Sequence, residues 1–146
     1  MRSLCNLVAV LGLVVTLVSG CAVNRATATV DPKTDLTKLK TMYVKKIPED
    51  DGGTNVLIVD KLATKGVTAT TGEGPAPAGI DAIVTYVDRW MWDITMYMLE
   101  LTVTLRDPKN NLPLASGNSF HTSLTRLSPK EMVNEVIDNI YKGGSK

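Results

Sequence analysis

The chain has 146 residues, a nearly neutral balance of 16 Lys and Arg against 15 Asp and Glu, and two cysteines. This length suits one globular domain. The balance argues against the clustered basic surface that nucleic-acid binding needs, so we expect no nucleic-acid partner.

The first twenty residues have the three parts of an export signal. Arg2 supplies a positive charge, an apolar run spans residues 7–18, and two small residues lie directly before Cys21. The run is about a dozen residues long, short of the roughly 20 that cross a bilayer as a stable helix. The sequence therefore predicts a removable signal peptide over residues 1–20.

The segment Val18-Ser19-Gly20-Cys21 resembles the lipobox of bacterial lipoproteins. The resemblance implies that the thiol of Cys21 is acylated, that a dedicated peptidase removes the residues before it, and that the acyl chains hold the protein in a lipid bilayer. Ala22 is not the aspartate that favours inner-membrane retention, which implies the outer membrane, facing the periplasm. An ordinary secretory signal and an uncleaved membrane anchor are the alternatives.

A polar, threonine-rich stretch follows the proposed lipidation site. We interpret residues 21–33 as a lipidated N-terminus and flexible tether, part of which can join the edge of a sheet, and residues 34–146 as a single domain. Cys5 lies in the signal and Cys21 carries the lipid, so we expect no disulfide.

The first part of the domain has the pattern of a strand–helix–strand unit. Residues 41–47 read as a strand, and residues 55–65 have apolar side chains at helical spacing. Thr54 is the expected N-cap and Gly66 the expected left-handed residue at the C-terminal end. Residues 67–71 are β-branched and read as the next strand.

The middle of the chain predicts a three-stranded antiparallel meander. Residues 82–90, 95–106 and 114–124 read as its strands, with turns near residues 92–93 and 107–111. The second strand alternates, with one face formed by Thr95, Tyr97, Leu99, Leu101, Val103 and Leu105.

The last element is a helix that begins at a capping box, Ser128-Pro129-Lys130-Glu131. Its expected apolar face is Met132, Val133, Val136, Ile137 and Ile140. The fold class we predict is α+β: a strand–helix–strand unit, the meander, and this C-terminal helix packed on the sheet.

His121 is the only histidine, and Ser119 and Ser123 flank it on one face of a strand. A catalytic pair could be built from these residues, but no nucleophile elbow or glycine-rich oxyanion loop accompanies them. We therefore expect a histidine on the solvent face of the sheet, no catalytic residues and no enzyme.

Metal and cofactor sites are not indicated either. One histidine and no free thiol do not make the usual zinc sets. Asp50 and Asp51 lie beside two glycines, but the alternating ligand spacing of a calcium loop is missing, so we expect a solvated loop. The sequence has no glycine-rich phosphate-binding motif.

The segment we consider most informative contains both tryptophans of the chain: Asp88, Arg89, Trp90, Met91, Trp92 and Asp93. Tryptophan, methionine and arginine are enriched at the centres of protein interfaces. The rings could instead cover the end of the core, or touch a membrane surface with their amphipathic edges.

The lipobox and the element order resemble small periplasm-facing lipoproteins of proteobacteria. The order is also similar to that of the lipopolysaccharide-assembly lipoprotein and the curli secretion component. The resemblance implies a non-enzymatic lipoprotein that binds or scaffolds another cell-envelope component through an exposed sheet face or hairpin tip. The alternative is a small-ligand or lipid-binding module with an apolar cleft between helix and sheet.

Overall fold

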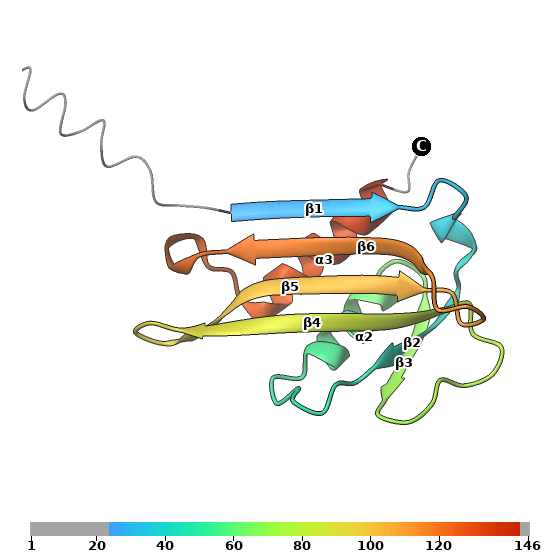
Figure 1. Ribbon diagram of the computed structural model, residues 1–146, viewed down its shortest axis with the longest axis horizontal. Coiled ribbons are helices and arrows are strands. Elements are labelled where there is room, and N and C mark those ends of the chain that lie inside the picture. The colour runs from blue at the N-terminus through green and yellow to red at the C-terminus, as the bar shows by residue number, and fades with distance from the viewer. Residues whose placement is uncertain (1–23, 144–146) are drawn as a thin grey trace, which may run out of the picture.

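The computed structural model describes residues 24–143, which form one six-stranded mixed sheet with two α-helices on the same face (Figure 1). The strands are β1 (Asn24–Val30), β2 (Thr41–Lys45), β3 (Thr68–Gly72), β4 (Ala82–Trp92), β5 (Met96–Arg106) and β6 (Pro113–His121). The helices are α2 (Thr54–Ala63) and α3 (Pro129–Gly143), with short 3₁₀ turns η1 (Leu36–Lys38) and η2 (Ser123–Thr125). The predicted signal peptide, the lipobox and Cys21 lie outside the described residues.

The mixed α+β class is confirmed, but the expected three-stranded meander is only part of the sheet. The strand order is β1-β6-β5-β4-β2-β3. β4, β5 and β6 are antiparallel neighbours, while β2 pairs in parallel with both β3 and β4. The outer edges of β4 and β6 carry backbone groups that need partners, and β2 and β1 supply them.

β1 is the part of the stretch over residues 21–33 that joins the edge of the sheet, as the sequence allowed. Residues 24–30 pair antiparallel with β6 over their whole length, from Asn24 opposite His121 to Val30 opposite Ala115. The strand is mostly exposed and contains threonine and alanine in place of large apolar residues. Its main stabilisation is therefore the backbone ladder with β6, which local sequence does not reveal.

The core lies between the helices and the sheet. The buried face of α3 is the predicted set: Met132, Val133, Val136, Ile137 and Ile140. From the other side, β5 contributes Leu101, Val103 and Leu105, each with no exposed surface. In the described part of the chain these side chains pack against one another where the sequence allowed an apolar cleft between helix and sheet.

A buried carboxylate, and not Thr54, caps α2. Gly53 is the N-cap residue, with φ +69°, and Asp50 accepts hydrogen bonds from the backbone N–H groups of Thr54 and Asn55, both at 2.9 Å. The hydroxyl of Tyr86 donates a third bond to Asp50 at 2.5 Å. Asp50 is therefore buried, contrary to the solvated loop expected from its neighbours, because it satisfies donors that α2 leaves unpaired.

The pKa values of this pair follow from the geometry. Burial alone would raise the pKa of Asp50, but the hydrogen bonds from Tyr86, Asn55 and Thr54 outweigh it, so the net effect is a lowered pKa. Burial and the bond to Asp50 raise the pKa of the Tyr86 hydroxyl. The charged carboxylate is therefore the form that the fold stabilises.

A bulge in β5 interrupts the predicted alternation. The register between β4 and β5 shifts after Arg89, which leaves Leu99 as an extra residue on β5. From Leu101 to Leu105 the alternation holds. On the other side of the bulge, Met98 and not Leu99 belongs to the core cluster.

The ends of the helices match two sequence predictions. In α3, the backbone N–H of Ser128 donates to Glu131 at 2.8 Å and the backbone N–H of Glu131 donates to the Ser128 hydroxyl at 3.3 Å, which confirms the capping box. After α2, Gly66 adopts the predicted left-handed conformation with φ +76°. Neither helix, nor any other in residues 24–143, is long and apolar enough to cross a membrane.

Candidate functional site

The tip of the β4–β5 hairpin carries exposed apolar side chains. Trp92 is 67% exposed, Ile94 87% and Met96 57%. Leu124, in η2 beside the hairpin turn, is 75% exposed. We call the following set the apolar tip: Trp90, Met91, Trp92, Ile94, Met96 and Leu124. Neither indole belongs to the core cluster, so the rings do not serve as its cover.

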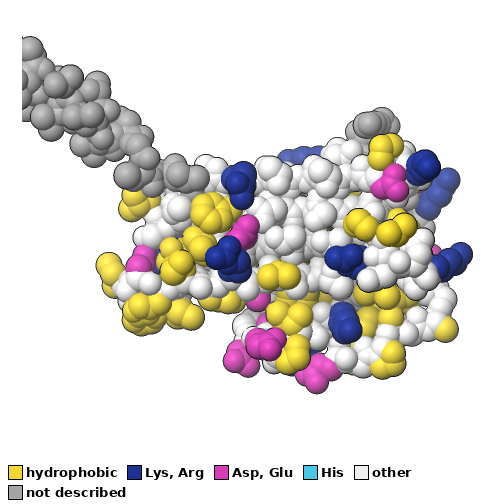
Figure 2. All heavy atoms as spheres, in the orientation of Figure 1, with side chains coloured by type: hydrophobic (Ala, Val, Ile, Leu, Met, Phe, Trp, Pro, Cys, Tyr) yellow, Lys and Arg dark blue, Asp and Glu magenta, His cyan; other side chains and the backbone are white. Residues whose placement is uncertain are grey.

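The tip extends past the rest of the sheet. Figure 1 shows the β4–β5 hairpin reaching beyond the neighbouring strands at the end of the sheet where β1 begins. Figure 2 shows hydrophobic side chains gathered over the same end of the molecule. Monomeric soluble domains seldom group large apolar side chains on a projecting element without an interaction to cover them.

The six residues singled out from the sequence have different roles. Asp88 accepts a hydrogen bond from the Thr54 hydroxyl at 3.0 Å, which joins β4 to the start of α2. Arg89 forms an ion pair with Glu100 on the neighbouring strand at 3.0 Å. Trp90 is half-buried, and its indole lies directly over Gly52, since a Cβ on that glycine would be 3.3 Å from the ring. Met91 and Trp92 are more exposed than Trp90, and all three apolar side chains have surface that another molecule can contact, whereas Asp93 is bound to Arg126.

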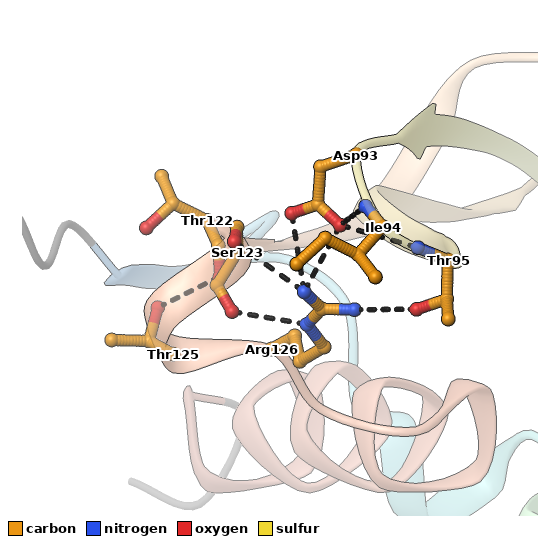
Figure 3. A network of polar contacts seen from close by, with 7 residues as sticks. All are labelled: Asp93, Ile94, Thr95, Thr122, Ser123, Thr125 and Arg126. Carbon is orange, nitrogen blue, oxygen red and sulfur yellow. Dashed lines mark hydrogen bonds and ion pairs between the residues drawn. The ribbon is translucent and has the colours of Figure 1, made fainter.

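Arg126 holds the hairpin turn in place (Figure 3). Its Nη2 donates to both carboxylate oxygens of Asp93 at 3.2 and 3.1 Å, and its Nη1 donates to the Thr95 hydroxyl at 2.8 Å. Its Nε donates to the backbone carbonyl of Ser123 at 3.0 Å. The guanidinium also lies over the ring of Tyr97, 4.7 Å from its centroid. One side chain therefore ties the turn to η2 and the start of α3.

The charge of Asp93 is satisfied within this network. Hydrogen bonds from the Ser123 side chain and the Ile94 backbone, together with the positive charge of Arg126, lower the pKa of Asp93 to about 2. The carboxylate is ionised and neutralised by its partners throughout the physiological range. The turn thus presents apolar side chains on a rigid support without an uncompensated acidic charge.

On the open face of the sheet, which the helices leave uncovered, polar side chains of β5 and β6 bond to one another, and separate hydrophobic side chains such as the exposed Val87 lie around them. Figure 2 shows this mixture of polar and hydrophobic side chains. The Thr104 and Ser116 hydroxyls are 3.0 Å apart. The Asn118 amide donates to Glu100 and to Thr102, both at 2.9 Å. Because these groups already have partners across the strands, the open face offers less to a binding partner than the apolar tip does.

His121 is buried, contrary to the solvent-exposed position expected from the sequence. It is 4% exposed, because β6 turns this face toward α3. Its Nε2 is 2.9 Å from Glu135, and its Nδ1 is 2.9 Å from the backbone carbonyl of Thr125. Ser119 donates to the same Glu135 oxygen at 2.6 Å. The carboxylate, and not the imidazole, accepts the hydrogen bond from the Ser119 hydroxyl, so these residues lack the nucleophile–base–acid order of a hydrolytic triad.

The described residues around the tip do not form a metal site or a small-molecule site. Within residues 24–143, no three His, Cys, Asp or Glu side chains are close enough to hold a metal ion. A groove of about 250 Å³ lies between the tip and the start of α3, lined by Trp90, Tyr97, Arg126 and Pro129 among others. Small-molecule sites usually measure about 300–1,000 Å³, so the groove is too small and open to indicate one.

Sequence reasoning found the tryptophans but missed part of the tip. Ile94 lies just beyond residues 88–93, and its signal in the sequence is an apolar side chain at a turn. Leu124 and Arg126 come from a segment about thirty residues later, and no local pattern links them to the hairpin. The contact between η2 and the turn appears only in the folded chain.

No family profile and no curated protein sequence matches the chain. Among solved structures it is similar to PelC of Paraburkholderia phytofirmans, a dodecamer, with a TM-score of 0.58 and 14% identity over 81% of this chain and 97% of that one. A PDZ domain protein from Parabacteroides distasonis has a TM-score of 0.50 and 12% identity, over 82% of this chain and 35% of that one. A minor lipoprotein from Acinetobacter baumannii, at 12% identity over 71% of this chain and 89% of that one, has a TM-score of 0.36, too low to compare folds. At these identities the first two likenesses concern the fold alone.

Proposed function

We propose that this protein is a lipoprotein anchored in the outer membrane and facing the periplasm, where it acts as a non-enzymatic module that binds or scaffolds another component of the cell envelope. The observation that carries the proposal is the apolar tip. Large exposed side chains, two of them indoles, stand on a hairpin that Arg126 fixes in position. Rigid aromatic anchors of this kind lose little conformational entropy on binding.

The sequence supports the anchored location. The lipobox-like segment ends at Cys21, three positions before the first residue of β1. Acylation there would keep the domain at a membrane surface, since each buried methylene contributes about 0.8 kcal/mol to membrane binding. Incorporation of radiolabelled palmitate, and its loss in Cys21→Ser together with membrane fractionation, tests this part of the proposal.

A photoreactive amino acid at position 92 in intact cells tests the binding role. We expect adducts from this position and not from Leu112, a matched control that is 61% exposed in the turn at the opposite end of β5. The proposal is wrong if neither position gives an adduct with a protein or a lipid, or if both give the same adducts in the same yield. The comparison separates a specific surface from general exposure of an apolar side chain.

The comparison with PelC favours a second candidate, in which the scaffold is built from copies of this chain. PelC was solved as a dodecamer, and the sheet described here ends in two open edge strands, β1 and β3. Edge strands are common sites of pairing between chains. Light scattering of the detergent-solubilised lipoprotein would reveal a large assembly, and a monomer at every accessible concentration would exclude this candidate.

A further inference from the structure

We propose that the apolar tip inserts into the surface of the same bilayer that holds the lipid anchor, so that the domain stands on the membrane at two points. This inference rests on the proposed function, because it names the component that the tip binds. The occupant is the interfacial region of the lipid bilayer. Three features favour this occupant: the position of the start of β1, the side chains of the tip, and the charges around the tip.

The start of the described chain and the tip lie at the same end of the sheet. Asn24, the first residue of β1, pairs with His121 at the end of β6. The preceding residue of β6, Phe120, pairs with Glu100, and from there β5 runs back to the tip at Met96. The antiparallel register thus brings together residues that are more than seventy positions apart, and Figure 1 shows both at one end.

The chain between the lipidation site and the sheet is short. Cys21 precedes Asn24 by three positions. A fully extended chain covers at most about 3.6 Å per residue, so three steps allow a separation of no more than about 11 Å between the acylated cysteine and the first residue of β1. The anchor therefore holds this end of the domain, and not the end with Leu112, against the lipid surface.

The side chains of the tip are those that bilayer interfaces favour. Tryptophan is enriched at the boundary between headgroups and acyl chains, where its ring is in apolar surroundings and its N–H stays hydrated. Trp92 is joined there by Ile94, Met96 and Leu124, all mostly exposed. Apolar faces of interfacial proteins enter the membrane to a depth of about 5–10 Å, which a projecting hairpin can reach.

Insertion of the tip into the bilayer would not bury an unpaired acidic charge. Asp93 is the only acidic residue between Trp90 and Met96, and it is bonded to Arg126. Arg25, next to the chain start, lies over the ring of Phe120 at 5.7 Å from its centroid. Both arginines are at the end of the domain that would face the lipid, where phosphate groups are available to them.

The two tryptophans of the chain allow a direct test, because both belong to the tip and fluorescence therefore reports on it alone. The lipidated protein, purified from membranes, is reconstituted into phosphatidylethanolamine–phosphatidylglycerol vesicles, with or without bromine on the upper acyl chain. We expect tryptophan emission in the vesicles to be blue-shifted relative to that of a water-exposed indole. We expect its intensity in the brominated vesicles to be at least two-fold lower than in the unbrominated ones. The variant Trp90→Phe, which keeps only the more exposed indole, should be quenched more strongly than Trp92→Phe.

A matched pair of charge variants provides the control. Ile94→Asp should reduce the quenching to near the level of unbrominated vesicles, while Leu112→Asp, at the opposite end, should leave it unchanged. Absence of quenching in the wild-type protein, equal quenching in Ile94→Asp, or failure of the protein to float with the vesicles would overturn the inference. A shift that depends on protein concentration and not on bromine would assign the tip to a second copy of the chain and also overturn it.

The outcome separates this inference from the proposed function. If lipid does not quench the tryptophans but position 92 forms protein adducts in cells, the tip binds a protein partner, so the proposed function stands and the membrane contact is wrong. If quenching and adducts are both missing, both proposals fail.

Discussion

Gly117 controls how closely α3 packs on the sheet. It lies on the buried face of β6, and a Cβ added there would be 2.9 Å from Cγ1 of Ile140 and 3.0 Å from Cγ1 of Val136. Ordinary carbon–carbon contacts are about 3.5–4.0 Å, so a single methyl group would have to push α3 away by more than half an ångström. Only glycine allows the helix to reach this distance without strain.

We expect Gly117→Ala to lower the free energy of unfolding by about 1–2 kcal/mol. Overpacking a tight core costs about 1–3 kcal/mol, and reduced freedom of the unfolded chain returns about 0.4–1 kcal/mol. Urea unfolding followed by far-ultraviolet circular dichroism measures the difference. The matched control is Gly74→Ala, where no atom lies within 4 Å of the new Cβ, and it should change stability by less than about 0.5 kcal/mol.

A double-mutant cycle identifies the cause. Ile140→Ala removes the side-chain atoms nearest to the new methyl group, so the combined variant should lose less stability than the sum of the two single variants, by about 1 kcal/mol or more. If Gly117→Ala is as stable as the wild type, or if the two changes are additive, the close approach of α3 does not limit this position and the reasoning fails.

Three other predictions concern polar contacts. The pKa of Asp50 is lowered in the folded state, so its contribution to the free energy of unfolding is present above the unfolded pKa of about 3.9 and is lost as pH falls through the folded pKa. Asp50→Asn should therefore lower the free energy of unfolding by about 1–3 kcal/mol near pH 7. Urea unfolding should show the difference between wild type and variant becoming smaller toward pH 3. His121→Ala should cost about 1–3 kcal/mol through its lost bond to Glu135, and an unchanged urea midpoint would contradict this. Ser128→Ala removes half of the α3 capping box and should cost about 0.5–2 kcal/mol with the urea m-value unchanged, and a neutral effect would refute the role of the cap.

The correct sequence predictions concern interactions between near neighbours. The α3 capping box, the left-handed Gly66 and the buried face of α3 each depend on residues a few positions apart. The strand–helix–strand order and the β4–β5 hairpin are local in the same sense. The spacing of apolar residues and the turn residues can be recognised in the sequence, because helix and strand geometry repeat every few residues.

The wrong predictions concern residues whose environment comes from distant segments. Asp50, and not the predicted Thr54, caps α2, and the third hydrogen bond to Asp50 comes from Tyr86, thirty-six positions away. His121 was expected at the surface, but α3 covers it. The bulge at Leu99 is equally invisible in the sequence, because it is a property of the pairing between two strands.

The candidate site divides in the same way. The sequence by itself determined that both tryptophans lie near a hairpin turn and that a lipobox-like segment precedes the domain. Only the tertiary structure decided that the indoles remain outside the core, that Arg126 braces the turn, and that β1 starts at the same end as the tip. The physical reason is that exposure and proximity are set by which strands pair and which face the helices cover, and these choices join residues far apart in the chain.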